Sequence, residues 1–251
     1  IPVFQGVSSA LLAVETAKEA ENIRYHGQDG FGDVFDDDLD VSAVQAEHAV
    51  IALRRIISEN PNEVSLICLG PLTNIALAIS IYPEMMKLVK DIWIMGGNLS
   101  AIGNTSPQAE FNFYADPESV HIVLGSCTKP LWLMPWETCL RSTISHNWRL
   151  NVVGKLSSKK IELSNKVEDG VYSKKKKGPF YTPCDAFLVA AFVDSSVILK
   201  ETEFHADIEL NGTKTRGQVV LDHLKKNEPN IHAIQDIDFE KFQKIMYAAY
   251  E

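Results

Sequence analysis

The segment Val64-Ser65-Leu66-Ile67-Cys68-Leu69 is a nearly continuous apolar run that stops at Gly70-Pro71-Leu72-Thr73-Asn74. An unbroken apolar run is typical of a strand covered on both faces, as strands of parallel sheets are. Residues 75–89 then follow a helical pattern, and Asp91-Ile92-Trp93-Ile94-Met95 forms the next apolar run. A strand, a helix and a second strand in this order predict a βαβ unit of a parallel sheet.

The same alternation continues on both sides of this unit. Downstream, Asp116 offers an N-cap and Pro117 a first-turn proline for a helix over residues 118–124. Residues 130–134 indicate another buried strand, and apolar positions between residues 46 and 57 follow helical spacing upstream. The chain therefore repeats strands and helices in the order that a parallel sheet requires.

The C-terminal part has a different pattern. Residues 204–210 alternate apolar and polar, and Asn211-Gly212 turns the chain into residues 216–221, which predicts an antiparallel hairpin. We therefore expect one α/β domain over residues 1–251. Its mostly parallel, Rossmann-like sheet is flanked by helices and carries a small antiparallel hairpin near the C-terminus.

The composition excludes several classes of protein. Thirty-three Asp and Glu against 24 Lys and Arg leave a formal net charge of −9, and an acidic surface repels the phosphate backbone of a nucleic acid. The densest apolar stretch, residues 187–193, is far shorter than the roughly 20 residues of a membrane-spanning helix. We expect no nucleic acid polymer and no membrane as a partner. The four cysteines form no C-x-x-C pair, so we interpret them as reduced.

The segment after Met95 is the richest in polar side chains. It is a long loop that carries Asn104, Glu110 and Asn112 before the next helix. Ligands of parallel α/β sheets bind outside the carboxyl ends of the strands, and long loops in compact domains are usually functional. Amides and carboxylates suit the adjacent hydroxyls of a sugar. The alternative is that these side chains only cap the loop.

Three other segments carry candidate chemistry. Asp185 precedes the apolar stretch 187–193 and is placed either to cap a helix or to bind a hard cation. His26 lies in the glycine-rich loop 26–33, where an imidazole donates a proton near neutral pH, or is simply a surface histidine. The third segment is the acidic run from Asp36.

Acidic residues at 36, 38, 40 and 47 resemble the spacing of an EF-hand loop. Val41 stands where that loop needs glycine for its sharp turn, so we interpret the run as a solvated helix start. Four consecutive lysines, 174–177, followed by Gly178-Pro179 indicate an exposed loop.

Taken together, these segments resemble the inosine/uridine-preferring nucleoside hydrolase family. The order and spacing of the matching segments hold along essentially the whole chain. The most specific are Leu69-Gly70-Pro71-Leu72-Thr73-Asn74 and the loop of Gly103-Asn104, Ala109-Glu110-Phe111-Asn112 and Asp116-Pro117-Glu118. The others are Pro2-Val3-Phe4-Gln5-Gly6, His26-Gly27-Gln28-Asp29-Gly30-Phe31-Gly32-Asp33, Met95-Gly96-Gly97, Pro183-Cys184-Asp185 and Arg216-Gly217-Gln218.

The resemblance implies hydrolysis of the N-glycosidic bond of a ribonucleoside to ribose and free base. It implies a Ca²⁺ cofactor that holds the ribose diol and a water, with Asp185 and the backbone carbonyl of Leu69 as ligands. It also implies that a ribose site is formed by Met95, Asn104, Glu110, Phe111 and Asn112. The implied partner is a small-molecule ribonucleoside, and the implied assembly is a homo-oligomer, either dimer or tetramer. We favour a cytoplasmic location and leave secretion open, because the chain does not begin with Met.

Two departures from the family pattern affect the chemistry. The aspartate-rich signature D-T-D-x-G-x-D-D, which supplies further metal ligands and the base for water, would precede Ile1, so we interpret the chain as part of a longer hydrolase. Cys184 stands where many relatives carry a histidine acid, and a thiol is a poorer acid at neutral pH. Leaving-group activation then falls to His26, to Tyr172 or to the substrate. The alternatives are a non-catalytic ribose- or nucleoside-binding protein and an unrelated Rossmann-like enzyme such as a methyltransferase.

We predict that residues 1–251 alone release no measurable ribose from inosine or uridine, because most charged ligands of the Ca²⁺ are missing. We also expect poor solubility, since loss of the family's first strand exposes a strand edge. The measurement is reducing-sugar release with and without chelator, compared with a chain extended by the aspartate motif. Calcium-dependent turnover by residues 1–251 would contradict this prediction.

Overall fold

The structure is a computed structural model that describes residues 1–12, 25–35, 41–173 and 177–251. The interpretations made above for Asp36, Asp38 and Asp40, and for the first three lysines of the run 174–177, lie outside the described residues. Within them no helix is long and apolar enough to cross a membrane.

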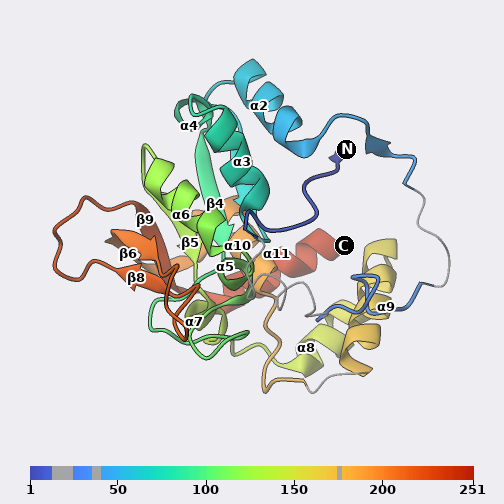
Figure 1. Ribbon diagram of the computed structural model, residues 1–251. Coiled ribbons are helices and arrows are strands. Elements are labelled where there is room, and N and C mark those ends of the chain that lie inside the picture. The colour runs from blue at the N-terminus through green and yellow to red at the C-terminus, as the bar shows by residue number, and fades with distance from the viewer. Residues whose placement is uncertain (13–24, 36–40, 174–176) are drawn as a thin grey trace.

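The core of the fold is a five-stranded sheet with the strand order β3-β4-β5-β9-β6 (Figure 1). The first four strands pair in parallel, and β6 pairs with β9 in antiparallel orientation. This confirms the predicted α/β class with a mostly parallel sheet. The strands are β3 (Ser65–Cys68), β4 (Asp91–Met95), β5 (Leu131–Met134), β9 (Ile231–Ile237) and β6 (Ile198–Phe204).

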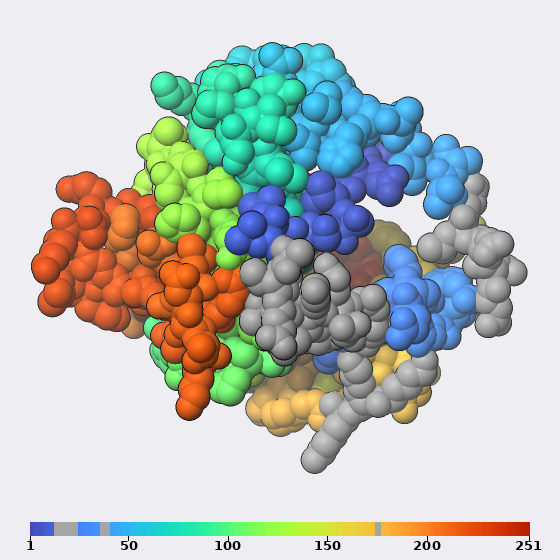
Figure 2. Space-filling model, viewed as in Figure 1, coloured from blue at the N-terminus to red at the C-terminus, as the bar shows by residue number. Residues whose placement is uncertain are grey.

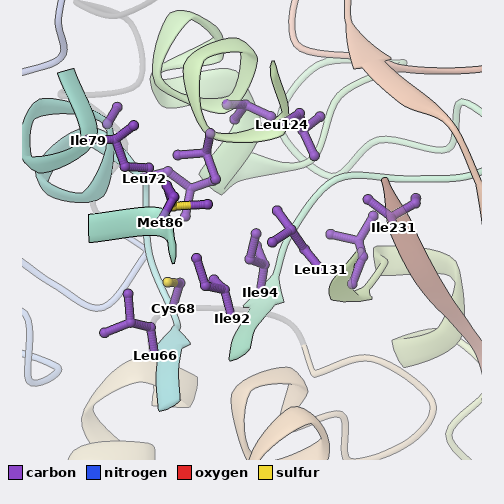
Figure 3. Packing of buried hydrophobic residues seen from close by; sticks show 14 of the residues in the cluster. Leu66, Cys68, Leu72, Ile79, Met86, Ile92, Ile94, Leu124, Leu131 and Ile231 are labelled. Atoms are coloured by element: carbon purple, nitrogen blue, oxygen red, sulfur yellow. The ribbon is translucent and has the colours of Figure 1, made fainter. Parts of the chain in front are cut away.

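One face of the sheet packs against a layer of four helices. Leu66, Ile92 and Leu131 on the strands belong to the same buried cluster as Ile79 and Met86 on the helices (Figure 3). Alternation along each strand sends every second side chain to this face. The helices of the layer are α2 (Ala49–Glu59), α3 (Thr73–Ile81), α4 (Met85–Leu88) and α6 (Pro117–Ser126).

The opposite face is covered by α10 (Cys184–Val193) and α11 (Phe239–Tyr250). Trp93 on β4, Phe187 on α10 and Phe242 on α11 share a second buried cluster. The Trp93 ring stacks on that of Trp132, its register partner on β5, with 4.6 Å between centroids. A sheet covered on both faces explains why its central strands are apolar without a break.

The remaining elements lie around this three-layer core (Figure 1). Two short strands, β1 and β2, pair in parallel with each other, and the other helices join the strands or follow them. These elements are β1 (Val3–Phe4), β2 (Val44–Gln45), α5 (Phe111–Ala115), α7 (Trp136–Cys139), α8 (His146–Asn151), η1 (Val153–Lys155), α9 (Lys159–Ser173) and η2 (Ser195–Val197).

The prediction of one continuous helix over residues 75–89 is wrong. It is divided into α3 and α4, because Tyr82 leaves the helical region with φ −131° and ψ 69°. Pro83 follows directly, and a proline disfavours the helical conformation of the residue before it. The upstream helix begins at Ala49, later than the apolar spacing indicated, with the His48 side chain accepting from the Val50 N–H.

The predicted C-terminal hairpin is confirmed, with narrower strands. β7 (Ala206–Ile208) pairs with β8 (Val219–Leu221) in antiparallel orientation, apart from the main sheet. Phe204 belongs instead to β6 at the sheet edge. The connection runs from Glu209 to Gln218, whose backbones bond each other, so it is much longer than the turn Asn211-Gly212.

The glycine-rich loop of residues 25–35 packs on α9. In Figure 2 the loop is blue and the helix beside it is yellow. A Cβ added to Gly32 would lie 2.7 Å from the Val167 carbonyl oxygen and 2.9 Å from the Val171 nitrogen. Gly32 has φ +79°, a conformation that only glycine adopts without strain. The sequence of this loop therefore permits direct backbone contact with a helix that is distant in the sequence.

We predict that Gly32→Ala destabilises the protein more than Gly30→Ala does. Both residues have positive φ, so both variants carry the strain of a left-handed alanine, about 1–2 kcal/mol. Only Gly32 meets the α9 backbone, whereas no atom of the described residues lies within 4 Å of a Cβ at Gly30. The overpacking adds about 1–3 kcal/mol to the loss. Urea unfolding measures both, and equal midpoints for the two variants would contradict the packing.

Candidate functional site

The candidate site lies at the carboxyl ends of β3, β4 and β5. The segments that follow these strands are tied together: the Gly96 N–H donates to the Met134 carbonyl over 3.1 Å, and the Trp136 N–H donates to the Gly97 carbonyl over 3.0 Å. In parallel α/β sheets this edge binds ligands. The polar residues after β4 and the first turn of α10 are both predicted to belong to it, and the charge of Asp185 adds to the raised pKa of Glu110.

Glu110 is the most buried polar residue predicted for the site, with 2% of its surface exposed. One carboxylate oxygen accepts from the Asn112 N–H over 2.9 Å. The other accepts from the Gly97 N–H over 2.8 Å and from the Phe113 N–H over 3.3 Å. Glu110 is thus the N-cap of α5 and also fixes the turn after β4. The loop-capping interpretation holds for this residue, whatever it does for a substrate.

Asn112 and Met95 are in contact, as a shared site requires. The buried Asn112 side chain donates from Nδ2 to the Met95 carbonyl over 2.9 Å and contacts the Met95 sulfur at 3.7 Å. Asn104 is exposed, and its Oδ1 accepts from the Phe111 N–H over 2.8 Å. Phe111 is half-buried and packs against Tyr114. The residues predicted to hold ribose therefore run from the floor of the site, at Met95, to its surface, at Asn104.

Burial raises the pKa of Glu110 to about 7, and the negative charge of Asp185 adds to this effect, although three backbone N–H groups favour the carboxylate. Burial raises the pKa of the Asp185 carboxyl as well, although the residue as a whole is exposed. Two carboxyl groups at one edge of the sheet, each harder to ionise than in water, are typical of a site that binds a cation or a polar ligand.

The N-cap interpretation of Asp185 is wrong. The N-cap of α10 is Pro183, no side chain caps this helix, and Asp185 is its second residue. The Asp185 carboxylate therefore does not cap the backbone N–H groups of its own helix. It stays available to a ligand at the positively polarised helix start.

A metal ion at this site would be bound by oxygen atoms. Asp185 offers a carboxylate, and Leu69, exposed directly after β3, offers a backbone carbonyl. These are the hard ligands that Ca²⁺ prefers, but Ca²⁺ takes 6–8 oxygens. In the part of the chain that the structure describes, no three His, Cys, Asp or Glu residues are grouped to hold a metal ion. Two oxygen donors from the described residues are too few for such a shell.

Two of the three candidate proton donors lie near each other. Cys184 is the first residue of α10, and its thiol donates to the Thr182 carbonyl over 3.6 Å. Tyr172, near the end of α9, interacts electrostatically with Cys184. Burial, followed by the neighbouring Tyr25 and Glu168, raises the pKa of Tyr172 to about 12. The phenol therefore keeps its proton at neutral pH.

His26 is placed less directly. Its ring is exposed and lies edge-on to Tyr25, with 5.0 Å between centroids. Tyr25 also helps to raise the pKa of Tyr172 through an electrostatic interaction. The imidazole of His26 lies at the surface, and its place in the candidate site stays a prediction.

Sequence reasoning missed Glu137, on α7. Its carboxylate accepts from three backbone N–H groups of the loop after β4: Leu99 over 2.9 Å, Ser100 over 2.7 Å and Ile102 over 3.3 Å. A signal was present, because Glu137 follows the strand 131–134 closely and so lies at the same sheet edge. Glu137 is a positioning residue for the loop that carries Asn104.

Asp116 joins the N-terminal segment to the site. As predicted it caps α6, accepting from the Ser119 N–H over 3.1 Å. Its other oxygen accepts from the Thr73 hydroxyl over 2.6 Å and from the Leu11 N–H over 3.1 Å. Figure 2 shows the N-terminal residues in dark blue lying beside α3. One buried carboxylate therefore connects three distant segments.

A cavity of about 370 Å³ lies elsewhere. Its lining includes Pro130, which precedes β5, and Asn230, which precedes β9. It therefore opens at the amino ends of the strands, and none of the predicted site residues lines it.

Comparison with known proteins gives consistent results. The model of the family described as inosine-uridine preferring nucleoside hydrolase matches residues 1–244. The inosine-uridine preferring nucleoside hydrolase of Leishmania major is 31% identical over 260 residues, covering 100% of this chain and 79% of that protein. The probable uridine nucleosidase 1 of Oryza sativa subsp. japonica is 40% identical over 126 residues, covering 50% of this chain and 38% of that protein.

A solved structure of an inosine-guanosine nucleoside hydrolase has a TM-score of 0.85 and 27% identity, covering 98% of this chain and 80% of that chain.

We predict that Glu137→Ala loosens the loop of residues 99–102 while the sheet stays intact. Each unpaired N–H costs about 1–3 kcal/mol when it remains buried. Hydrogen exchange at Leu99, Ser100 and Ile102 should accelerate about 10-fold or more, with unchanged exchange in β4. The control is Glu63→Ala, at an exposed glutamate outside the site. Unchanged protection of the three amides in Glu137→Ala would contradict the positioning role.

We predict a pH-dependent stability difference between the protein and its Glu110→Gln variant. The unfolded carboxyl ionises near 4.5 and the folded one near 7. Between these values the folded state binds more protons, so the contribution of Glu110 to stability falls as pH rises, by on the order of 3 kcal/mol. Urea unfolding in chelator at pH 5 and pH 8 tests this. Parallel pH profiles of the two proteins would contradict it.

Proposed function

Because this chain belongs to the inosine-uridine preferring nucleoside hydrolase family, we propose that its site serves hydrolysis of the N-glycosidic bond of ribonucleosides. Water adds to the anomeric carbon, the bond to the base breaks, and the base leaves with a proton. The observation that supports the proposal is the buried Glu110 carboxyl in the polar loop after β4, whose raised pKa the charge of Asp185, at the start of α10, raises further. This interaction is consistent with one site at the carboxyl ends of the strands.

The loop after β4 would bind the ribose. Asn104 stands at the surface end and Asn112 at the buried end, and each already bonds the backbone near the site. Such side chains are held in place before a sugar arrives, so little conformational freedom is lost on binding. Glu110 and Asn112 would accept from and donate to ribose hydroxyls, while Met95 and Phe111 supply apolar contact.

Asp185 and the Leu69 carbonyl would hold a Ca²⁺, and the ribose diol and water would complete part of its oxygen shell. When bound, the ion lowers the pKa of its water and orients the sugar hydroxyls. We propose that the described residues supply the ribose-binding and leaving-group parts of the hydrolase site.

Tyr172 is the favoured donor toward the departing base. Its raised pKa keeps the phenol protonated, so it donates a hydrogen bond without being ionised at neutral pH. The hydrogen of Cys184 is directed to the Thr182 carbonyl, which removes it from the base. His26 would transfer a proton only if its loop approached the site on substrate binding.

The assay of this proposal is ribose release from inosine and uridine by the chain extended with the family's aspartate motif. Asp185→Asn should lose at least about 100-fold in kcat/KM, and Asp169→Asn, at an exposed position on α9, should lose nothing. Nucleoside binding without any turnover by the extended chain would favour the alternative, a non-catalytic ribose- or nucleoside-binding protein. Neither binding nor turnover would overturn both.

We predict that Cys184→His raises turnover of poorly activated nucleosides in the extended chain. A positioned general acid is worth about 10²–10⁴-fold, and the imidazole titrates near neutral pH. Cys127→His, at a half-buried thiol lining the cavity at the amino ends of the strands, is the matched control. If Cys184→His leaves the rates on both purine and pyrimidine nucleosides unchanged, another group already activates the base.

A further inference from the structure

A buried arginine joins α8 to α9. Arg149, on α8, is 1% exposed. Its Nε donates to Glu168 Oε1 over 3.1 Å, and its Nη1 donates to Asn165 Oδ1 over 2.9 Å. Both acceptors lie on α9, and they are three residues apart, so they occupy the same face of the helix. The planar fork of one guanidinium therefore holds α9 at two successive positions.

The same carboxylate oxygen also binds the segment that leads into α10. The Tyr181 hydroxyl donates to Glu168 Oε1 over 3.1 Å, and the Arg149 guanidinium carbon lies 5.9 Å from the centroid of the Tyr181 ring. The Tyr181 backbone is fixed as well, because its N–H donates to the Ile144 carbonyl over 2.8 Å and its carbonyl accepts from the Ser142 hydroxyl over 2.6 Å. Glu168 thus connects α8, α9 and the segment before α10.

A second contact between α8 and α9 brings Tyr172 into this network. The ring of His146, the first residue of α8, lies edge-on to the Tyr172 ring with 6.3 Å between centroids. It lies edge-on to the Tyr181 ring as well, also at 6.3 Å. Tyr172 follows Glu168 by four residues on α9, and residues at this spacing share one face of a helix. The side of α9 that Arg149 holds is therefore the side that carries Tyr172.

We infer that Arg149 is a positioning residue for Tyr172. Desolvation of the charges offsets much of the stability that a buried ion pair provides, so what the pair with Glu168 supplies is a fixed geometry between α8 and α9. Moving Glu168 would move the Tyr172 ring, one turn further along the same helix. The task assigned to the Tyr172 phenol rests on the proposed function; the dependence of its position on Arg149 does not.

The position of Tyr172 is measured by fluorine NMR of the chain labelled with 3-fluorotyrosine. The Tyr172 resonance is the one that Tyr172→Phe removes. Arg149→Lys keeps the charge but loses the fork that reaches both acceptors on α9, and we expect it to shift or broaden this resonance. Tyr181→Phe removes only one hydroxyl and leaves the ion pair intact. It should have the same effect, and it serves as the test if Arg149→Lys does not fold.

Arg55→Lys is the matched control for this measurement. Arg55, on α2, pairs with Glu47 through its Nη2 over 2.6 Å, and α2 covers the other face of the sheet. This variant should leave the Tyr172 resonance unchanged. An unchanged Tyr172 resonance in folded Arg149→Lys, or in Tyr181→Phe where Arg149→Lys does not fold, would overturn the inference.

Kinetics of the extended chain separate positioning of Tyr172 from a general loss of structure. Arg149→Lys should lower kcat about 10-fold or more with KM nearly unchanged, because a misplaced group costs turnover while the loop after β4 still binds ribose. In the Tyr172→Phe background the same change should lose less than about 2-fold, since the residue through which it acts is gone. Additive losses would overturn positioning through Tyr172.

Failure of the proposed function has a different signature. A Tyr172 resonance that shifts in Arg149→Lys but not in Arg55→Lys, in an extended chain that never hydrolyses nucleosides, would support the positioning by Arg149 and contradict the proposed function.

Discussion

The carboxylate of Glu110 is the constraint on which the rest of the site depends. Its two oxygens bind N–H groups from the turn after β4 and from the first turn of α5. A buried carboxylate is costly to desolvate, and this cost appears as a pKa of about 7. The bonds to backbone amides partly offset it and fix a long loop that would otherwise have little to hold it. The charge of Asp185 raises the pKa of Glu110 further.

Around Glu110 the site is assembled from segments that are far apart in the chain. Glu137 binds the tip of the loop from α7, and Asp116 binds both the N-terminal segment and the start of α3. In each case a carboxylate accepts from backbone N–H groups that no helix or strand satisfies, which is the usual requirement for buried loop backbone. Negative charge is thus concentrated at this edge of the sheet and suits a cation or a polyhydroxyl ligand.

Cys184 and Tyr172 are the described candidates for contact with a departing base. The Cys184 thiol donates to the Thr182 carbonyl over 3.6 Å. Burial raises the pKa of Tyr172 to about 12, so the phenol keeps its proton at neutral pH. On the proposed function, these groups would hydrogen-bond the base rather than transfer a proton from a cationic acid.

The sequence by itself determined the fold class, the strands β3, β4 and β5 and the cap of α6, because these depend on local apolar runs and on capping residues. It also identified the polar loop after β4, since glycines and amides after an apolar strand predict a ligand-binding edge. The helix over residues 75–89 was wrong because the effect of Pro83 on Tyr82 was overlooked, although it was readable from the sequence.

Tertiary structure alone decided which distant residues meet. β9 lies between β5 and β6 although almost 100 residues separate β5 from it in sequence. No local pattern specifies that neighbour, since it depends on which exposed edge the last strand covers. The contacts of Glu137 with the loop and of Gly32 with α9 have the same origin. Each joins segments that only the packing of helices on the two faces of the sheet brings within reach.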